Sequence, residues 1–587
     1  MDLSGQIKSL FKPQERPHPP NAELSVREGY GRAEKDFRWM ETNVPCRKAC
    51  PAGTDIPAYL TAIAEARYDE AYRINLRDNV FPGILGRICS RPCEAACRHG
   101  YAGLGEPVAI CFSKRAAEEQ ADPKPVLLPA WYPPSGKHVA VVGSGVAGLT
   151  VARNLTLLGH RVTVYEKYAR PGGMLNQAIP EFRLPRRIID REIGQIAALG
   201  VEIICNTAIG TDLPLSRLLA RFDAVVMAAG TLKPNLLNIP GQDLAGIRHG
   251  LDFLLEVNQT GKAEIGRRAI VIGGGFTAMD CARTARRLGT RIVQWDLKVL
   301  YRRSRDEMRI TPGELEELEE EGIPLECHAI PCAYLGDRGQ VTGMRFRNTQ
   351  DDQIFDVPAD TVLLATGQFP DTSWTGESDE PAASDPKLFA AGDYAQGSTS
   401  LIDAIAHAKE TVDRVDAYLM GAARMRPVIH VEPAQATGRT LDMDQVERQS
   451  MPTLAVSERD LSGEVEQGYD PAAARVEAER CYRCNYKFEI DQDKCIKCDW
   501  CLKARPRPEC ILMLKTITHD DEGCVVSWES TDNVREMNLI WINADECIRC
   551  GECLKACPVD AINLQKVSLH AEPSCTEESP PNPEERP

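Results

Sequence analysis

Cysteine is the residue type with the clearest capacity for chemistry in this chain, which holds 22 cysteines among its 587 residues. Thiolates bind soft metal ions and iron–sulfur clusters, and this load in a chain without a secretory signal is more typical of metal binding than of a disulfide framework. Six lie near the N-terminus: Cys46, Cys50, Cys89, Cys93, Cys97 and Cys111. Ten lie near the C-terminus: Cys481, Cys484, Cys495, Cys498, Cys501, Cys510, Cys547, Cys550, Cys553 and Cys557. Both ends are therefore predicted to bind metal, and the cysteine-poor middle is predicted to be another kind of module.

The C-terminal cysteines form two runs. Cys547, Cys550, Cys553 and Cys557 have the spacing C-x₂-C-x₂-C-x₃-C followed by proline, which is typical of bacterial [4Fe–4S] ferredoxins. The other run, Cys495, Cys498, Cys501 and Cys510, has a longer last gap. In such runs the fourth thiolate binds the cluster of the other run. The two predicted ligand sets are therefore Cys495, Cys498, Cys501 and Cys557, and Cys547, Cys550, Cys553 and Cys510. Zinc sites use cysteine pairs rather than triplets, so zinc is disfavoured.

The middle of the chain begins with a glycine-rich motif between an apolar strand and a helical pattern. Gly143, Gly145 and Gly148 form G-x-G-x-x-G, and Glu166 ends the next strand. The first glycine allows the tight turn, the second lets a pyrophosphate approach the backbone, and the third lets the helix pack on the strand. The helix N-terminus then faces the phosphates, and Glu166 is placed to accept a hydrogen bond from a ribose hydroxyl. This segment predicts a dinucleotide-binding fold.

A second motif of the same kind follows at Gly273, Gly275 and Ala278. The strand after its helix ends without an acid and continues into Arg302 and Arg303. Arginines at this point favour the 2′-phosphate of NADP(H) over NAD(H), although two surface arginines on an exposed turn are the alternative.

Two further segments are assigned to the first dinucleotide fold. The apolar stretch 361–367 ends in glycine and is expected to be one of its strands. Gly392 and Asp393 end another strand and precede a helical pattern, so that the aspartate is placed to bind a flavin ribityl hydroxyl. The first fold is therefore predicted to bind FAD and the second a nicotinamide nucleotide. No Cys pair lies beside the first helix, so a redox disulfide next to the flavin is not expected.

The fold class is α/β, with two Rossmann-like dinucleotide-binding domains, one inserted in the other, between a helical iron–sulfur domain and an α+β ferredoxin-like domain. A net charge of −16 disfavours a nucleic-acid partner, and the absence of 18 consecutive apolar residues disfavours a membrane span. We expect a cytoplasmic protein. The predicted organisation is a polar arm (1–40), a helical iron–sulfur domain (41–120), a linker (121–136), an FAD-binding domain (137–235 and 360–420), an NAD(P)H-binding domain (236–359), a second linker (421–480), a ferredoxin-like domain (481–566) and an acidic disordered tail (567–587).

The chain resembles a known family, the FAD oxidoreductases related to the glutamate synthase small subunit. The N-terminal half of dihydropyrimidine dehydrogenase and the large subunit of the electron-bifurcating ferredoxin:NADP oxidoreductase belong to the same group. The resemblance rests on motifs at 50–60, 86–100, 106–110, 172–185, 273–289, 301–308 and 390–393. It implies FAD, NAD(P)H and [4Fe–4S] clusters, with Gly173 and Met174 beside the flavin. Phe276 and the stretch Asn176-Gln177-Ala178 depart from the usual pattern of the family.

The resemblance also implies a ligand set in the N-terminal domain. Cys50, Cys89, Cys93 and Glu106 would hold one cluster, with Cys111 as an alternative to Glu106. That leaves Cys46 and Cys97 without the cysteine pair that completes a second cluster in the family. The missing pair typically has the context EA-x-R-C-x-x-C, which this chain carries at 477–484. The hypothesis is that Cys481 and Cys484 complete the second cluster; a lost cluster and a separate zinc pair are the alternatives.

These features predict an electron-transfer subunit of a larger redox complex. Hydride would pass between NAD(P)H and FAD, and single electrons would pass through the clusters to or from a partner. The expected partner is a ferredoxin or the catalytic subunit of a molybdenum, tungsten or glutamate-synthase-type enzyme, in a hetero-oligomer. The alternatives are an electron-bifurcating subunit, a redox sensor and a non-catalytic iron–sulfur assembly subunit.

Overall fold

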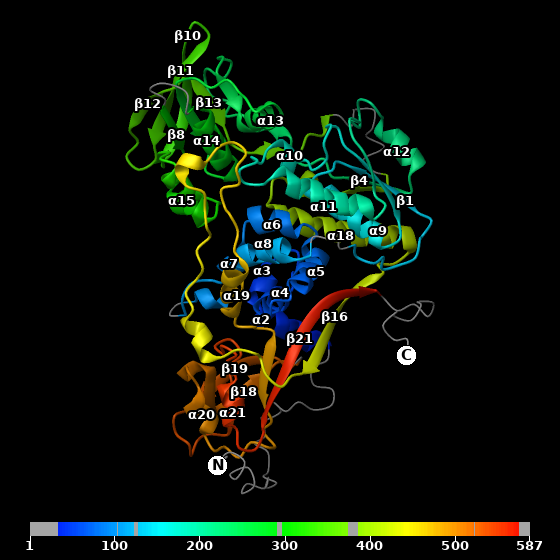
Figure 1. The fold of residues 1–587 in the computed structure, drawn as a ribbon, viewed down its shortest axis with the longest axis vertical. Coiled ribbons are helices and arrows are strands. Elements are labelled where there is room, and N and C mark those ends of the chain that lie inside the picture. The colour runs from blue at the N-terminus through cyan, green and yellow to red at the C-terminus, as the bar shows by residue number, and fades with distance from the viewer. Residues whose placement is uncertain are drawn as a thin grey trace.

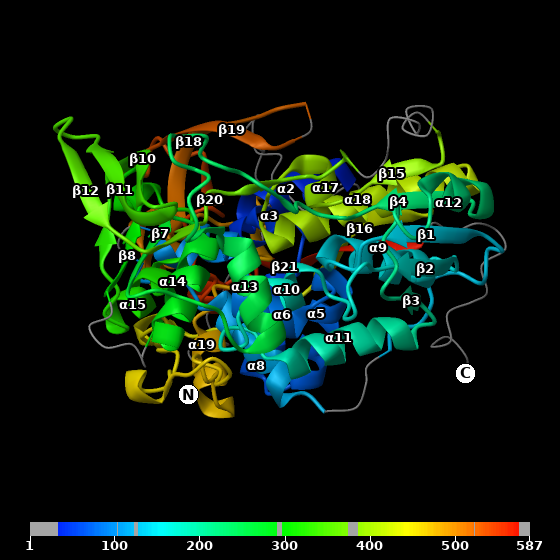
Figure 2. The ribbon, with the colours of Figure 1, turned by 90° about the horizontal axis from the view of Figure 1, so that it is seen from above.

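The computed structural model describes residues 33–101, 104–122, 127–289, 296–373, 385–521 and 523–573. A helical domain lies at the centre of the molecule, with the two dinucleotide-binding domains beside each other at one end and the C-terminal domain at the other (Figure 1). Seen from above, the two dinucleotide-binding domains flank the helical domain (Figure 2). Most of the arm predicted for 1–40 and most of the predicted disordered tail lie outside the described residues.

The helical domain consists of short helices joined by tight turns. Its helices are α2 (Ala33–Asn43), α3 (Pro45–Ala49), α4 (Ile56–Ala64), α5 (Tyr68–Asn79), α6 (Pro82–Ile88), α7 (Pro92–Ala95) and α8 (Ile110–Gln120). Proline occupies one of the first two positions of α3, α4, α6 and α7, where its missing N–H would be unpaired in any case. Because each proline starts a new helix, the turns that carry the cysteines recur at short intervals.

The first dinucleotide-binding domain contains a parallel five-stranded sheet in the order β15-β4-β1-β2-β3. The strands are β1 (His138–Val142), β2 (Arg161–Tyr165), β3 (Glu202–Ile204), β4 (Ala224–Met227) and β15 (Leu388–Ala390). Helices on its faces include α9 (Val146–Leu157), α11 (Arg186–Ala198), α12 (Leu215–Arg221) and α18 (Leu401–Met420). All of β4 and nearly all of β1 are buried, as expected for parallel strands covered on both faces.

The second dinucleotide-binding domain contains the sheet β6-β13-β7-β8-β9. These strands are β6 (Ile247–His249), β13 (Thr361–Leu364), β7 (Arg268–Ile272), β8 (Asp296–Leu300) and β9 (Leu325–Glu326). Its helices are α13 (Gly250–Thr260), α14 (Phe276–Gly289) and α15 (Pro312–Glu320). A three-stranded antiparallel sheet is added by β10 (Ala329–Asp337), β11 (Gln340–Asn348) and β12 (Ile354–Pro358).

The assignment of 361–367 to the first fold was wrong. This stretch contains β13, which pairs in parallel with β6 and β7 in the second sheet. An apolar strand that ends in glycine fits either sheet, because hydrophobicity alone does not specify the pairing partner. The chain returns to the first domain only afterwards, where β14 (Gln368–Phe369) pairs with the outgoing β5 (Lys233–Pro234).

The C-terminal part is more ordered than the sequence indicated. β16 (Met425–Pro433) lies in the segment predicted as a linker and pairs with β21 (Ile562–Pro573), which also pairs with β17 (Tyr486–Ile490). The end of β21 replaces the first residues of the predicted disordered tail. The other elements here are α19 (Pro471–Glu479), α20 (Trp500–Ala504), α21 (Glu552–Ala556), and the sheet of β18 (Ile511–His519), β19 (Val525–Ser530) and β20 (Leu539–Ile542).

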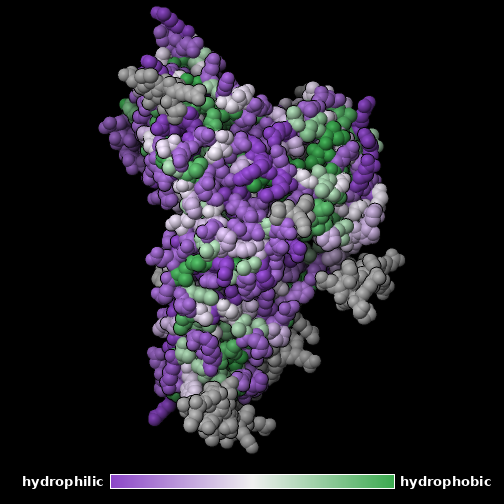
Figure 3. Space-filling model, viewed as in Figure 1, coloured by the Kyte–Doolittle hydropathy of each residue, from purple (hydrophilic) through white to green (hydrophobic). Residues whose placement is uncertain are grey.

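The surface drawn in Figure 3 is mostly hydrophilic, with apolar residues in small separate groups. Among the described residues, no helix has the length and apolar character needed to cross a membrane.

Candidate functional site

The glycine loop of the first domain has the geometry that its sequence predicts. Gly143 has a φ of +101°, and a Cβ on it would lie 2.5 Å from the carbonyl oxygen of Ala228. A Cβ on Gly148 would lie 2.0 Å from the carbonyl oxygen of Gly143, so this helix packs too closely for any side chain. By contrast, nothing lies within 4 Å of a Cβ on Gly145, which precedes the first residue of α9. The open space at this helix N-terminus suits a pyrophosphate.

Glu166 lies directly after β2, beside the glycine loop. Its carboxylate accepts hydrogen bonds from the backbone N–H groups of Ser144 (3.0 Å) and Tyr168 (2.9 Å). The side chain is only 4% exposed. These hydrogen bonds fix the carboxylate beside the glycine loop, and ribose binding by Glu166 stays a prediction.

Two other predicted segments meet the same helix end. Gly173 has a φ of +53°, and a Cβ on it would lie 2.8 Å from the Cα of Gly145; Met174 follows as the first residue of α10 (Met174–Gln177). A Cβ on Gly392 would lie 2.4 Å from the Cβ of Ala147. Asp393, the first residue of α17 (Asp393–Gln396), accepts a hydrogen bond from the backbone N–H of Thr399 (3.2 Å), and burial raises its pKa.

The second domain repeats the loop geometry. A Cβ on Gly273 would lie 2.4 Å from the carbonyl oxygen of Ala365, whereas Gly275, just before α14, is open. Ala278 is fully buried. Arg302 and Arg303 follow β8, the neighbour of β7, and both are exposed. Two guanidinium groups are therefore available near the carboxyl end of β8, where a 2′-phosphate is expected.

The structure brings the last cysteine of one ferredoxin-type run to the first three cysteines of the other run. Cys495, Cys498, Cys501 and Cys557 line one cavity. The other set is Cys510, Cys547, Cys550 and Cys553. Burial, and then the neighbouring thiolates of Cys547 and Cys550, raise the pKa of Cys510 to about 12. Burial and the same two thiolates also raise the pKa of Cys553.

In the helical domain, Cys50, Cys89, Cys93 and Cys111 lie around the buried ammonium group of Lys114. Burial alone would lower the pKa of Lys114, but the four thiolates outweigh it and raise the pKa. Glu106, which the resemblance implied as a ligand, has an exposed side chain, and its backbone oxygen accepts a hydrogen bond from Arg480 (2.7 Å). The structure thus favours Cys111 over Glu106, because Cys111, the second residue of α8, is buried and its thiol interacts with those of Cys89 and Cys93.

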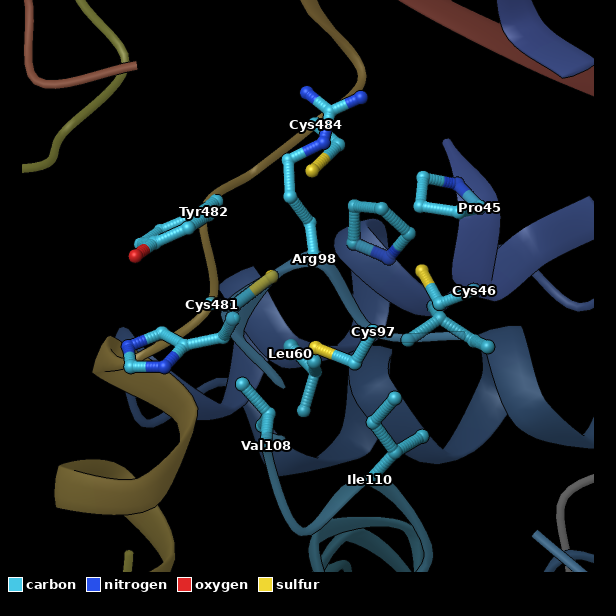
Figure 4. Close-up of a pocket in the computed structure, with 13 residues that line it drawn as sticks. Pro45, Cys46, Leu60, Cys97, Arg98, Val108, Ile110, Cys481, Tyr482 and Cys484 are labelled. Atoms are coloured by element: carbon cyan, nitrogen blue, oxygen red, sulfur yellow. The ribbon is translucent and has the colours of Figure 1, made fainter. Parts of the chain in front are cut away.

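Cys46, Cys97, Cys481 and Cys484 line a further cavity between the helical domain and the segment before β17 (Figure 4). Burial raises the pKa of Cys97 to about 12 and that of Cys481 to about 11. Within the described residues, no three His, Cys, Asp or Glu side chains converge closely enough to hold a single metal ion. The four thiols instead surround their cavity.

Comparison with known proteins matches three families along the chain. The family described as pyridine nucleotide-disulphide oxidoreductase matches residues 137–410, dihydropyrimidine dehydrogenase domain II with a 4Fe-4S cluster matches 37–124, and the 4Fe-4S binding domain matches 540–563. The NADP(+)-dependent formate dehydrogenase subunit beta of Moorella thermoacetica is 34% identical, over 75% of this chain and 70% of its own length. The NADPH-Fe(3+) oxidoreductase subunit beta of Geobacter sulfurreducens is 32% identical, over 75% of each chain. The glutamate synthase [NADPH] small chain of Azospirillum brasilense is 32% identical, over 70% of this chain and 94% of its own length.

The chain belongs to the glutamate synthase small-chain family of flavin oxidoreductases. Like the rest of this family, it is an FAD-dependent NAD(P)H oxidoreductase that transfers electrons through [4Fe–4S] clusters. The residues present fit these groups, since an open glycine loop begins α9 and the buried cysteines are free thiols.

Two residues that contact the predicted cluster ligands were not found by sequence reasoning, because they belong to no motif. Lys114 is one, although a lysine one turn after Cys111 in an otherwise buried helical stretch was a usable signal. Arg549 is another: it is buried between Cys547 and Cys550 and donates hydrogen bonds to backbone oxygens on two sides. Its role depends on a neighbour 65 residues away, which no local pattern indicates.

Proposed function

We propose that the chain exchanges electrons between NADP(H) and a separate catalytic subunit of a redox complex. The observation that carries the choice of nucleotide is the pair Arg302 and Arg303, exposed directly after β8. A planar guanidinium group binds phosphate oxygens in a bidentate manner, and it stays charged at all working pH values. A nucleotide without the 2′-phosphate would leave both groups without a ligand.

The residues around the first glycine loop would hold FAD. The N-terminus of α9 and Gly145 would bind the pyrophosphate, Glu166 a ribose hydroxyl, and Asp393 the ribityl chain. When bound, FAD exchanges a hydride with the nicotinamide and single electrons with the clusters. The protein contributes the separation and orientation of the two nucleotides, because no side chain is required for hydride transfer itself.

The ferredoxin-like domain would carry the outer cluster and face the partner. Two thiols of one set, Cys495 and Cys498, are partly exposed, whereas in the other set Cys547 is partly exposed and Cys510, Cys550 and Cys553 are buried. Trp500, between Cys498 and Cys501, has a side chain that is 39% exposed. A cluster held by partly exposed thiols beside an exposed aromatic ring is suited to electron exchange with another protein.

A subunit of formate-dehydrogenase type is the first partner to test, because the beta subunit of such an enzyme is among the most similar relatives. Purification of the full-length chain from its own organism under exclusion of oxygen should recover a second subunit, and the complex should reduce NADP⁺ with formate. Recovery of a glutamate-synthase-type large chain instead would reject this partner.

The nucleotide is tested on the purified chain by anaerobic rapid mixing with NADPH or NADH. NADPH should bleach the flavin and cluster absorbance faster than NADH at equal concentration. Equal rates, or faster bleaching by NADH, would reject NADP(H) as the substrate. No bleaching by either nucleotide would reject the proposed function as a whole.

A further inference from the structure

We propose that Cys46, Cys97, Cys481 and Cys484 together bind a fourth [4Fe–4S] cluster, which joins the flavin half of the chain to its ferredoxin-like domain. The ligands come from opposite ends of the sequence, two from the helical domain and two from residues more than 370 positions later. The proposed electron path through this cluster rests on the proposed function, but the metal site itself does not.

The four thiols have the surroundings of cluster ligands. They line one cavity whose other walls are largely apolar, among them Leu60, Val108 and Ile110 (Figure 4). Cys46, Cys481 and Cys484 are each at most 8% exposed. Four thiols that converge on one largely apolar cavity match the ligand set of a [4Fe–4S] cluster.

The remaining cysteines of both ends support the same grouping. Three other sets of four thiols are complete without these four: one around Lys114 and two in the ferredoxin-like domain. The sixteen cysteines assigned above to the two ends thus divide into four sets of four, and Cys524 and Cys575, which have no ligand spacing, stay outside them. A zinc pair at Cys481 and Cys484 alone would leave Cys46 and Cys97 without a role.

A spacing of four residues joins the proposed set to the set around Lys114, and joins the two ferredoxin-type sets to each other. Cys46 is the second residue of α3 and Cys50 follows its end, and Cys93 and Cys97 stand in the same way at α7. Each pair divides its thiols between the same two sets. In the ferredoxin-like domain, Cys553 and Cys557 divide theirs in the same way along α21. Four residues of helix rise by only about 6 Å, so neighbouring sets lie close together.

The proposed site of Cys46, Cys97, Cys481 and Cys484, called the joint from here on, also contacts the ferredoxin-like domain directly. The guanidinium group of Arg549 donates to the carbonyl oxygens of Cys547, in one set, and Cys484 (3.5 Å), in the other. Arg98, next to Cys97, donates to the carbonyl oxygen of Ala544 (2.7 Å), as Arg549 does. Buried arginines therefore fix the two ligand loops to each other.

On the opposite side, the set around Lys114 lies against the flavin domain. Lys409 of α18 donates to the carbonyl oxygen of Ala52 (3.1 Å), two residues after Cys50. Glu192 of α11 accepts a hydrogen bond from the backbone N–H of Gly83 (2.6 Å) at the start of α6, which ends before Cys89. The order is thus flavin domain, Lys114 set, the proposed joint, and the two ferredoxin-type sets. Each NADPH that gives up a hydride becomes NADP⁺ and supplies two electrons, which leave along this order one at a time.

The test compares the full-length native protein with the double variant Cys481→Ala/Cys484→Ala, both purified and reconstituted without oxygen. The matched control is Cys327→Ala/Cys332→Ala, which removes two partly buried thiols of the nicotinamide domain. We expect about 16 iron atoms per native or control chain and about 12 per double variant, at four irons per cluster. A native protein with about 12 irons, or a double variant that keeps all its iron, would overturn the site.

The electron path has a separate readout, electron paramagnetic resonance of samples frozen after rapid mixing. In the double variant, NADPH should still bleach the flavin but no longer reduce the ferredoxin-type clusters, which dithionite should reduce in both proteins. Reduction by NADPH at native rate would overturn the joint. A native protein that NADPH does not reduce at all would overturn the proposed function while the iron count still decides the site. Should the double variant fail to fold, Cys484→Ser serves instead: a changed cluster signal at unchanged FAD content supports the site, and an unchanged spectrum overturns it.

Discussion

Glu192 makes the stability of this protein depend on pH through a single buried carboxyl group. The side chain is 2% exposed and lies where α11 of the flavin domain meets α6 of the helical domain. Burial raises its pKa from 4.5 to about 7, although the N–H groups of Gly83 and Ile84 oppose this by donating to the carboxylate. At pH 6 the folded protein therefore holds a proton at Glu192 that the unfolded chain has lost.

The sign and size follow from this difference in proton binding. Between about pH 4.5 and pH 7 the folded state binds more protons than the unfolded state, so the free energy of unfolding falls as pH rises. A shift of about 2.5 pKa units at about 1.36 kcal/mol per unit corresponds to about 3 kcal/mol. Above pH 7 both states are ionised and this contribution no longer changes.

The assay is thermal or denaturant unfolding of the native protein and Glu192→Gln at pH 5 and pH 8. The amide keeps the acceptor oxygen for Gly83 but cannot ionise. Because part of the unfolded chain is still protonated at pH 5, the variant should gain about 2.5 kcal/mol relative to the native protein between the two pH values. Glu317, whose pKa burial also raises to about 7, remains in both proteins and cancels in the comparison. A difference between the two proteins that stays constant from pH 5 to pH 8 would refute the reasoning.

Three further predictions concern the cofactors. Replacing Arg302 and Arg303 by alanine should raise the KM for NADPH about 30- to 160-fold and leave that for NADH unchanged, because each charge-assisted contact at an exposed site is worth about 1–1.5 kcal/mol. The steady-state control is Arg338→Ala, at a 91% exposed arginine of the same domain, and equal effects on both nucleotides would contradict the assignment. Gly145→Ala should fold normally, since its Cβ meets no protein atom, yet lose FAD, because the Cβ would enter the space proposed for the pyrophosphate. Gly148→Ala should instead lose stability. FAD content and melting temperature together separate the two variants, and a Gly145→Ala protein that keeps its FAD would count against the pyrophosphate site. Lys114→Met should lower the reduction potential of the adjacent cluster by about 60 mV or more, equivalent to about 1.4 kcal/mol for one electron. The reason is that the electron taken up on reduction loses the buried positive charge of Lys114 beside it. A redox titration followed by paramagnetic resonance that finds no shift would refute this.

Features encoded by neighbouring residues could be predicted from the sequence. Both glycine loops, the acid after β2 and the exchanged fourth cysteines depend on spacings of at most a few tens of residues. The sequence also led to the family, which the comparisons confirm.

Features that depend on distant pairing could not. The stretch that forms β13 was assigned to the wrong sheet because its composition fits both. β16 was read as linker because its partner, β21, lies more than 130 residues further along the chain. Likewise, only the folded chain distinguishes the exposed Glu106 from the buried Cys111, since both lie within one turn of the buried start of α8 in sequence.

The ribbon formed by β16 and β21 restricts how the ferredoxin-like domain can move. Nine consecutive residue pairs, from Met425 with Pro573 to Pro433 with Gln565, fasten the far end of this domain to the segment that leaves α18. Both ends of the domain are thus anchored, one of them by a continuous ladder of backbone hydrogen bonds. The domain therefore cannot move as a unit between an electron donor and an electron acceptor. For this reason the rate of electron transfer within the chain should not depend on solvent viscosity. Diffusion enters only when the external partner arrives, and that encounter alone should slow in glycerol.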